Sequence, residues 1–386
     1  MEWRKLTINA QAHMIIPLDE VQVRRLRLRA QRLIPSLAAP GVTAEQVLIE
    51  LCGVQGQELP AARLSLRARA EGVTLAEIET ARQVTHTLVR TWVMRGTLHL
   101  VTTQDARWLV PLLAPLMING NRKRMLALGW DEERTLRGLH LLEEALARHD
   151  SLIRSEIKLL LKQNGLPSEG QATIHLIFRA AWEGILIQGA DRGKQPTFTV
   201  CAAWTGGLQP KPRAAALADL AQRYLQAYAP ATVGDLATWS GLKAGEARQA
   251  IQMIEDKLTP VDAAGQPAWM LASQLPWLDE LAGLPPVVRL LPRFDTYLLG
   301  YASRELMVAP QFARRINAGG GLLNQVLMVD SYARGLWSTR PVKGQMEVII
   351  EPFEPLDPQV LPGLEAEAAS LGRFLGKETS LQIAGG

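Results

Sequence analysis

The stretch TVGDLATWSGLKAGEARQAIQMIEDKLTPVDAAGQPAWML (residues 232–271) decides the fold. Thr232 is a typical N-cap and Gly241 is a typical C-cap, so together they delimit a short helix. A longer amphipathic helix follows over residues 243–258, and a hairpin then turns near the AAGQ segment. With the preceding helical segment ALADLAQRYLQAYAP (216–230), this is the order of a winged helix-turn-helix unit, whose longer helix occupies the recognition position.

The same order of elements occurs twice more upstream. Residues 20–103 contain amphipathic helical segments followed by TLVRTWVMRGTLHLVT (87–102), where apolar and polar residues alternate with the period of strands. Gly96 in the middle of this stretch predicts a bulge or a tight bend. Residues 131–203 repeat the order, and the region between the two units, 104–130, predicts a helix broken by prolines.

From about residue 286 the pattern changes to strands. The segments VVRLLPRFDTYLLGY (287–301), NQVLMVDSYARGLWS (324–338) and GQMEVIIEPF (344–353) predict a small sheet or barrel, and residues 358–376 predict a closing helix. We therefore expect a mainly α protein with β wings, of the α+β class. The expected divisions are 1–130, 131–210, 211–285 and 286–386, with the Gly- and Pro-rich stretch 205–213 as the clearest linker.

Composition excludes several classes of protein. The 386 residues suffice for two or three domains, and nearly half of them are hydrophobic. The two cysteines predict no disulfide framework, and the six histidines never show the spacing of a zinc pair, so we expect no metal site. The opening residues 1–10 are polar, unlike a signal peptide, and the longest apolar stretch (108–118) is too short to span a bilayer. We therefore expect a cytoplasmic protein with no membrane segment.

Positive charge is concentrated in the first third of the chain. Residues 1–130 hold 17 Lys and Arg against 10 Asp and Glu, a balance of +7, whereas the remainder holds 25 against 28, a balance of −3. The basic runs RRLRLRAQR (24–32), RLSLRAR (63–69) and NRKR (121–124) therefore indicate a polyanion partner. The alternative is that each run is a solvated helix face.

Two glutamines in LCGVQGQELP (51–60) are the first candidate site residues. Gln55 and Gln57 flank Gly56 where an apolar helical run ends. On an extended segment they share a side, and the glycine permits close approach of the backbone. An amide does not titrate, but it can hold and aim a water molecule. The alternative is that both amides cap or cross-link neighbouring helices, because most side-chain amides bond to backbone.

Polar residues of the 87–102 stretch are the second candidates. Arg95, Thr97 and His99 alternate along it, as a face that grips a phosphate and orients a nucleotide would require. Arg69, in the second basic run, is a further candidate for DNA binding. The alternatives are an exposed wing face and a structural histidine. The segment LPRFDTYLLGYASRE (291–305) offers Asp295, Arg293, Arg304 and Glu305, among which we expect a structural Asp–Arg pair.

Six motifs, taken together and in order, resemble the AlkZ/YcaQ family of winged-helix DNA glycosylases over nearly the whole chain. They are GVQGQ (53–57), ARLSLRAR (62–69), LVRTWVMRGTLHLV (88–101), YAPATVGDLATWSGL (228–242), LLPRFDTYLLGY (290–301) and VLMVDSYARGLW (326–337). The resemblance implies tandem winged-helix units and a C-terminal β-rich domain that form a C-shaped, basic surface for duplex DNA. It implies no cofactor, and we expect a monomer.

The resemblance also implies an activity. Members of the family remove N7-alkylated purines from DNA, and the AlkZ branch unhooks interstrand cross-links. Their catalytic motif is Gln-x-Gln, or Gln-x-Asp in the YcaQ branch, and Gln55 and Gln57 match the first form. The chain departs from the family at Gly56, where an aliphatic residue is usual, and at Ser331, where relatives often have glycine.

The chemistry of the two amides agrees with such a substrate. An N7-alkylated purine is cationic and leaves as a neutral base, so it needs no strong general acid. Two amides that aim a water molecule are then sufficient, and uncharged lesions should be poor substrates. Two other classes of function remain open, a non-catalytic winged-helix DNA-binding protein or transcriptional regulator, and a protein-interaction scaffold.

Overall fold

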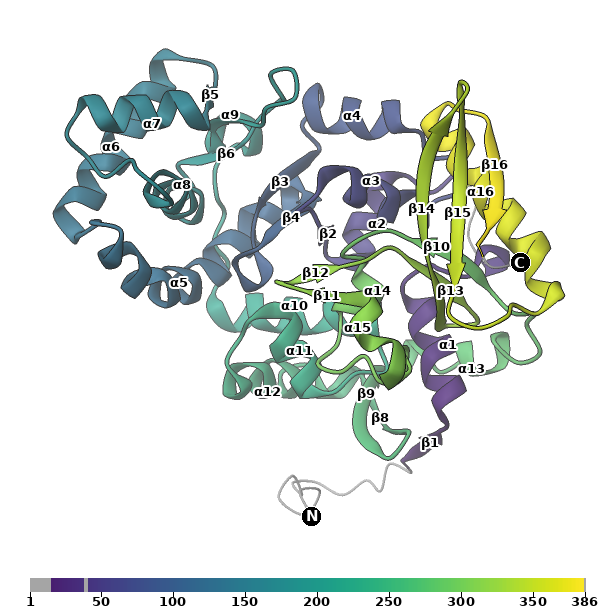
Figure 1. Cartoon of the computed structure of the whole chain (residues 1–386). Coiled ribbons are helices and arrows are strands. Elements are labelled where there is room, and N and C mark those ends of the chain that lie inside the picture. The colour runs from purple at the N-terminus through teal and green to yellow at the C-terminus, as the bar shows by residue number, and fades with distance from the viewer. Residues whose placement is uncertain (1–14, 38–40, 385–386) are drawn as a thin grey trace.

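The computed structural model describes residues 15–37 and 41–384, which form a mixed α and β chain (Figure 1). The opening residues 1–10, expected from the sequence not to be a signal peptide, lie outside this described part. In Figure 1 the helices α6–α8 lie at one end of the molecule and the C-terminal sheet lies at the other. No helix of the described residues is long and apolar enough to cross a membrane.

The first unit follows the order helix, strand, two helices, two strands. Its elements are α2 (Ala44–Leu51), β2 (Val54–Gln55), α3 (Leu59–Arg67), α4 (Leu75–Gln83), β3 (Leu88–Trp92) and β4 (Leu98–Thr102). The turn between β3 and β4 places Arg95 at φ 56° and Gly96 at φ 70°, in the left-handed region. The tight bend predicted at Gly96 is therefore confirmed.

The second unit has the same order. Its elements are α6 (Glu132–Arg148), β5 (Leu152–Ile153), α7 (Arg154–Gln163), α8 (Ala172–Trp182), β6 (Leu186–Gln188), β7 (Thr197–Val200) and the short α9 (Cys201–Thr205). Strands β3 and β6 pair antiparallel where Arg90 lies opposite Gln188. This pairing joins the two units into one six-stranded sheet of order β2-β4-β3-β6-β7-β5.

The connection between these units differs from the prediction. Helix α5 (Thr103–Ala127) runs through Pro111 and Pro115 without a break. A proline inside a helix costs about 3 kcal/mol, because one backbone hydrogen bond is lost. Helix α5 packs against α8 and α10 (Arg213–Tyr228), and each fully buried leucine contributes about 1.5–3 kcal/mol. Buried α5 residues such as Leu109, Leu112 and Leu113 therefore outweigh the two prolines.

The third unit contains the predicted elements in the predicted order, but the helix expected over 243–258 ends at Gln252 and a short 3-10 turn, Glu255–Lys257, follows it. After α10 come α11 (Val233–Ser240), α12 (Ala244–Gln252), β8 (Leu258–Ala263) and β9 (Gln266–Leu271). Thr232 caps α11 by accepting the N–H of Asp235, and Gly241 ends it at φ 85°. An N-terminal strand, β1 (Ile16–Leu18), pairs in parallel with β8, and α1 (Glu20–Ala30) packs against α10 and α13 (Trp277–Glu280). The N-terminal strand and helix thus pack on the third unit, although the sequence grouped them with residues 1–130.

The C-terminal part is a five-stranded sheet of order β10-β13-β14-β15-β16, covered by α16 (Leu361–Leu375). Its strands are β10 (Val288–Leu291), β13 (Val326–Val329), β14 (Tyr332–Val342), β15 (Gln345–Pro352) and β16 (Thr379–Ile383). The strand expected over 287–301 ends at Leu291, and α14 (Thr296–Leu299) follows, because the Asp295 carboxylate accepts the N–H of Tyr297 and caps a helix. Before β13 lie α15 (Ala313–Ile316) and the hairpin of β11 (Asn317–Gly319) and β12 (Leu322–Leu323).

Ser331 stands in the turn between β13 and β14. Its φ is 72°, in the region that glycine occupies without strain. The side chain is fully buried, and the Ser331 carbonyl accepts the Tyr297 hydroxyl at 2.9 Å. Glycine would adopt this left-handed backbone without strain, so serine is the less favoured residue at this position.

Candidate active site

The Gln-x-Gln segment begins on the outer strand of the six-stranded sheet, since β2 ends at Gln55. In β2, Gln55 lies directly opposite His99 of β4, and the Gly56 N–H donates to the Leu98 carbonyl at 2.7 Å. A Cβ atom added to Gly56 would lie 3.0 Å from the backbone nitrogen of Leu100. The close backbone approach predicted for this glycine is confirmed, and an aliphatic side chain here would require the β4 backbone to shift by a few tenths of an ångström.

Arg95 orients the first glutamine. One end of its guanidinium donates to Gln55 Oε1 at 3.1 Å, and the other end donates to the Trp239 carbonyl of α11 at 2.6 Å. Gly241, at the end of α11, lies so close that a Cβ atom there would be 3.2 Å from the Arg95 Cα. The β3–β4 turn is therefore held against the third unit, and the Gln55 carbonyl is held by a cation.

The second glutamine presents its side chain to open space. Gln57 is exposed, and its amide has no hydrogen-bond partner within residues 15–37 and 41–384. It lines a hollow of about 680 Å³ on the sheet. Neither amide caps a helix in the described part of the chain, but Gln55 is linked through Arg95 to the end of α11, so the alternative of a cross-link stays open for Gln55.

Arg90 is a site residue that the sequence analysis missed. Its guanidinium donates to the carbonyls of Gly56 and Gln57, at 2.7 and 3.1 Å, and to Gln188 Oε1 at 2.9 Å. Burial lowers the pKa of Arg90 to about 10, so the group remains a cation at neutral pH. Arg90 thus fixes the backbone at Gly56 and at Gln57. The sequence feature that could have identified Arg90 is its position two residues before Trp92 in a strand. Residues two apart in a strand share a face, and here that face lines the hollow.

His99 is placed differently from the prediction. Its side chain is only 2% exposed, and its Nδ1 lies 3.0 Å from the Thr97 carbonyl. Because a carbonyl only accepts, Nδ1 carries the proton. Burial, with a smaller effect from Arg95, lowers the pKa of His99 to about 3. A buried neutral imidazole does not grip a phosphate, so the predicted DNA contact by His99 is wrong. Thr97 is half-buried and lines the hollow beside Gln57.

We expect the titration of His99 to appear in stability and not in the rate of base excision. The folded-state pKa of about 3 lies below the ordinary value of 6.5. Between these values the unfolded chain binds more protons at this residue than the folded chain, so the free energy of unfolding falls as pH falls. Urea unfolding at pH 7 and pH 5 should show a larger loss for the wild type than for His99→Gln. Equal losses would count against the buried neutral imidazole.

Arg69 is also corrected by the structure. Its side chain is fully buried and makes a bidentate pair with Asp295, at 2.7 and 2.8 Å. The same guanidinium donates to Ser65, Gln31 and Thr296. The predicted role of Arg69 in DNA binding is therefore wrong, because no surface ligand reaches it. Asp295 does form a structural pair with an arginine, but the partner is Arg69 and neither Arg293 nor Arg304 of its own segment.

Most of the N-terminal arginines form ion pairs with carboxylates of the same chain. All eight arginines of the first two basic runs pair with carboxylates, as Arg24–Glu20, Arg25–Asp330, Arg27–Asp235, Arg29–Glu280, Arg32–Glu50, Arg63–Glu79, Arg67–Glu367 and Arg69–Asp295. The third run differs, since Arg122, Lys123 and Arg124 near the end of α5 are exposed. The cations available to a polyanion are therefore fewer than the formal balance of the first third indicated.

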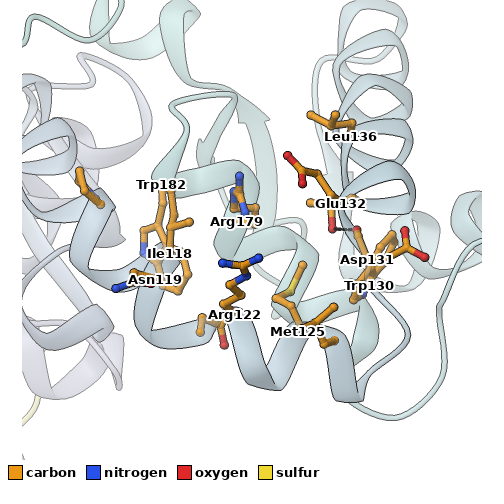
Figure 2. A pocket seen from close by; sticks show the side chains of 14 residues that line it. Ile118, Asn119, Arg122, Met125, Trp130, Asp131, Glu132, Leu136, Arg179 and Trp182 are labelled. Carbon is orange, nitrogen blue, oxygen red and sulfur yellow. Dashed lines mark hydrogen bonds between the residues drawn. The ribbon is translucent and has the colours of Figure 1, made fainter.

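Two more hollows continue from the Gln57 hollow along α8. The first, of about 400 Å³, is lined by Arg95 and Gly96 and by Asn121 and Trp182. The second, of about 390 Å³, lies between α5, α6 and α8, and Figure 2 shows Arg122 and Arg179 inside it. Among the described residues, no group of three or more His, Cys, Asp or Glu side chains lies close enough to hold a metal ion.

Gln55, held by a cation, and Gln57, beside a hollow, are the candidate site residues, and neither amide can act as an acid. Comparison with known proteins identifies the family to which the chain belongs. The profile of the family described as DNA glycosylase AlkZ-like matches residues 48–374. The chain therefore belongs to the AlkZ-like DNA glycosylases, and it is an enzyme of the DNA glycosylase class.

One curated relative and one solved structure are similar to the chain over most of its length. The interstrand DNA cross-link repair glycosylase of Streptomyces sahachiroi is 28% identical over 378 residues, which cover 92% of this chain and 96% of the relative. The solved structure of Streptomyces sahachiroi DNA glycosylase AlkZ matches with a TM-score of 0.80 and 26% identity, covering 96% of this chain and 100% of that chain. The α+β class and the family inferred from the sequence are thus confirmed.

Proposed function

We propose that this enzyme hydrolyses the N-glycosidic bond of cationic N7-alkylated purines in duplex DNA, with Gln55 and Gln57 as its catalytic residues. The observation that supports this most directly is the arrangement of the two amides. Arg95 holds the Gln55 carbonyl at 3.1 Å, and Gln57 lines a hollow without a partner among the described residues. Such groups position a nucleophile and do not protonate a leaving group.

The reaction that fits these groups needs little else from the protein. Water adds to C1′ of the sugar, and the bond from C1′ to the purine nitrogen breaks. The electron pair of that bond neutralises the cationic base, and the water molecule loses a proton to solvent. In this proposal the amide oxygens accept hydrogen bonds from the water and lie near the positive charge that develops on the sugar.

Family membership favours this enzyme over the non-catalytic regulator considered from the sequence. Because the relative from Streptomyces sahachiroi is named for interstrand cross-link repair, we further propose that this chain unhooks cross-links joined through purine N7. We propose that it acts as a monomer. The test is incubation with duplexes that carry N7-methylguanine, an N7-linked cross-link or uracil, followed by detection of abasic sites. Release of uracil but of no N7-alkylated base would overturn the proposal.

We propose that duplex binding is electrostatic, with contributions from Arg95, Thr97 and the exposed residues Arg122, Lys123 and Arg124. Affinity should fall steeply between about 50 and 200 mM salt, because binding releases counterions from DNA. Replacing residues 122–124 together by alanine should weaken binding to all duplexes alike. The salt slope should shrink by about one for each phosphate that the variant no longer neutralises.

The matched control is Arg63→Ala, because Arg63 is paired with Glu79 at 2.6 Å. Its salt slope should stay at the wild-type value. Fluorescence anisotropy with unmodified duplexes at several salt concentrations measures both variants. A slope that changes in Arg63→Ala and not in the triple variant would place the DNA surface elsewhere.

A further inference from the structure

The hollow beside Gln57 is built by both halves of the six-stranded sheet. Strand residues from the first unit form one side, and α7 and α8 of the second unit form the other. Its lining comprises Gln57, Arg90, Trp92, Gly96, Thr97, Leu98, Ile153, Arg154, Ser155, Lys158, Gly170, Ile174, Phe178, Gln188, Gln195, Pro196 and Phe198. We call this space the aromatic hollow. Gln57 is the one proposed catalytic residue in its lining.

The apolar part of the lining is aromatic. Trp92 packs against Phe178 with ring centroids 5.1 Å apart at 55°, and against Phe198 with centroids 6.4 Å apart at 20°. Trp92 and Phe198 are almost fully buried, whereas Phe178 and Ile174 are half-buried. A flat aromatic ring is the ligand that such a wall favours, because it can stack or meet the rings edge to face.

The polar part of the lining carries positive charge and, among the described residues, no carboxylate. Arg154 and Lys158 of α7 join Arg90 there. The Arg90 guanidinium already donates to three acceptors of the protein, so it is not free to bind an anion deep inside. Lys158 pairs with Glu169 at its edge. Arg154 and Lys158 at the rim favour a ligand that is attached to a polyanion such as DNA. The apolar interior favours an uncharged ring.

The size of the aromatic hollow exceeds what a simple lesion requires. At about 680 Å³ it falls within the range of pockets that enclose drug-sized ligands. A methyl group on a purine fills a small fraction of that space. N7 of a purine faces the major groove, so a group attached there projects away from the base pair and is free to enter a pocket.

We propose that the aromatic hollow binds a flat aromatic substituent carried on N7 of the purine whose glycosidic bond is cleaved. This inference rests on the proposed function, since it places Gln57 beside the scissile bond. The hollow thus selects among N7-alkylated purines, and Phe178 and Ile174 are the residues that set the selection. They bind the substituent and take no part in the chemistry.

The first variant is Phe178→Ala, tested on duplexes with N7-benzylguanine and with N7-methylguanine. The kcat/KM for the benzyl lesion should fall about 10-fold, mainly through KM, and that for the methyl lesion should change less than about 2-fold. Phe178→Leu, which keeps an apolar group, should lose most of the preference as well. The matched control is Phe353→Ala, a half-buried phenylalanine next to the C-terminal sheet, which should leave the ratio unchanged.

The second variant places a larger side chain in the aromatic hollow, and its activity on N7-methylguanine shows whether it is folded. Ile174→Trp should reduce excision of N7-benzylguanine about 10-fold and spare N7-methylguanine. A variant that excises N7-methylguanine normally is folded, so its selectivity can be interpreted. If Phe178→Ala and Ile174→Trp change both substrates by the same factor, the hollow holds the base itself or nothing, and the proposal is wrong.

Binding separates this inference from the proposed function. Duplexes with 2′-fluoro sugars, in which the glycosidic bond resists cleavage, can carry the same two lesions. The wild type should bind the benzyl duplex about 10-fold more tightly than the methyl duplex, and Phe178→Ala should bind both alike. Binding preference without excision from ordinary duplexes would sink the proposed activity alone. Excision without any binding preference would sink the aromatic hollow alone.

Discussion

Replacing Gln55 or Gln57 by alanine is expected to lower the rate of base excision from an N7-alkylated duplex by about 10²–10³-fold. Removing one positioned polar group from a site of this kind typically costs about 2.7–4 kcal/mol in the transition state. The binding of duplex DNA should hardly change, since neither amide is charged. Single-turnover excision of N7-methylguanine measures the rate, and anisotropy measures the affinity.

The matched control is Gln226→Ala, which removes an exposed glutamine of the third unit. All three variants should melt near the wild-type temperature, because Gln57 is exposed and Gln55 lies on a two-residue outer strand. A different pattern would revive the structural alternative, namely lower melting temperatures with excision lost only in proportion to unfolding. Folded alanine variants that excise at the wild-type rate would remove both glutamines from the mechanism.

Gln57→Asp gives a sharper test of the same site. It creates the Gln-x-Asp motif of the YcaQ branch, so it should retain part of the activity. A carboxylate binds and deprotonates water only when ionised, so the rate should rise with pH through the pKa of the new aspartate. The wild-type rate should show no such step. A wild-type step at the same pH would indicate a titrating group other than the two amides.

Arg69→Ala is expected to lower the free energy of unfolding by about 3–5 kcal/mol. The substitution leaves Asp295 as a buried charge without its partner, which is the costly half of a buried ion pair. It also removes donors from Ser65, Gln31 and Thr296, which belong to different parts of the chain. Equilibrium unfolding in urea, followed by circular dichroism, measures the change.

The control for this loss is Arg340→Ala. Arg340 pairs with Glu347 on the surface, and such exposed pairs contribute about 0–1 kcal/mol. If Arg69→Ala costs no more than Arg340→Ala, the buried pair does not hold the first unit to the C-terminal part.

Features that depend on a few neighbouring residues, such as helix caps and tight bends, were predicted from the sequence. Thr232 and Gly241 bound α11 as expected, because a cap depends on a few neighbouring backbone groups. The bend at Gly96 has the same origin. Gln55 and Gln57 are proposed from their spacing around a glycine, together with the family resemblance, and the structure adds the partner that holds Gln55.

Contacts between residues far apart in the sequence could not be predicted from local sequence patterns. Arg69 and Asp295 are 226 positions apart, and the residues around each in the sequence do not indicate that the two side chains pair. The same holds for the carboxylates that take up the N-terminal arginines, so a count of formal charge overstated the surface available to DNA. The pairing of Arg90 with Gln188, which merges two units, likewise depends on tertiary packing and not on periodicity.

The merged sheet has a consequence for self-association. An outer strand offers unpaired N–H and C=O groups, to which a strand from a second molecule can add. Here the outer strands, β2 and β5, are each two residues long. So short a strand offers too few hydrogen bonds to template an added strand. The segment proposed to be catalytic can therefore lie at an open edge of the sheet without promoting aggregation through that edge.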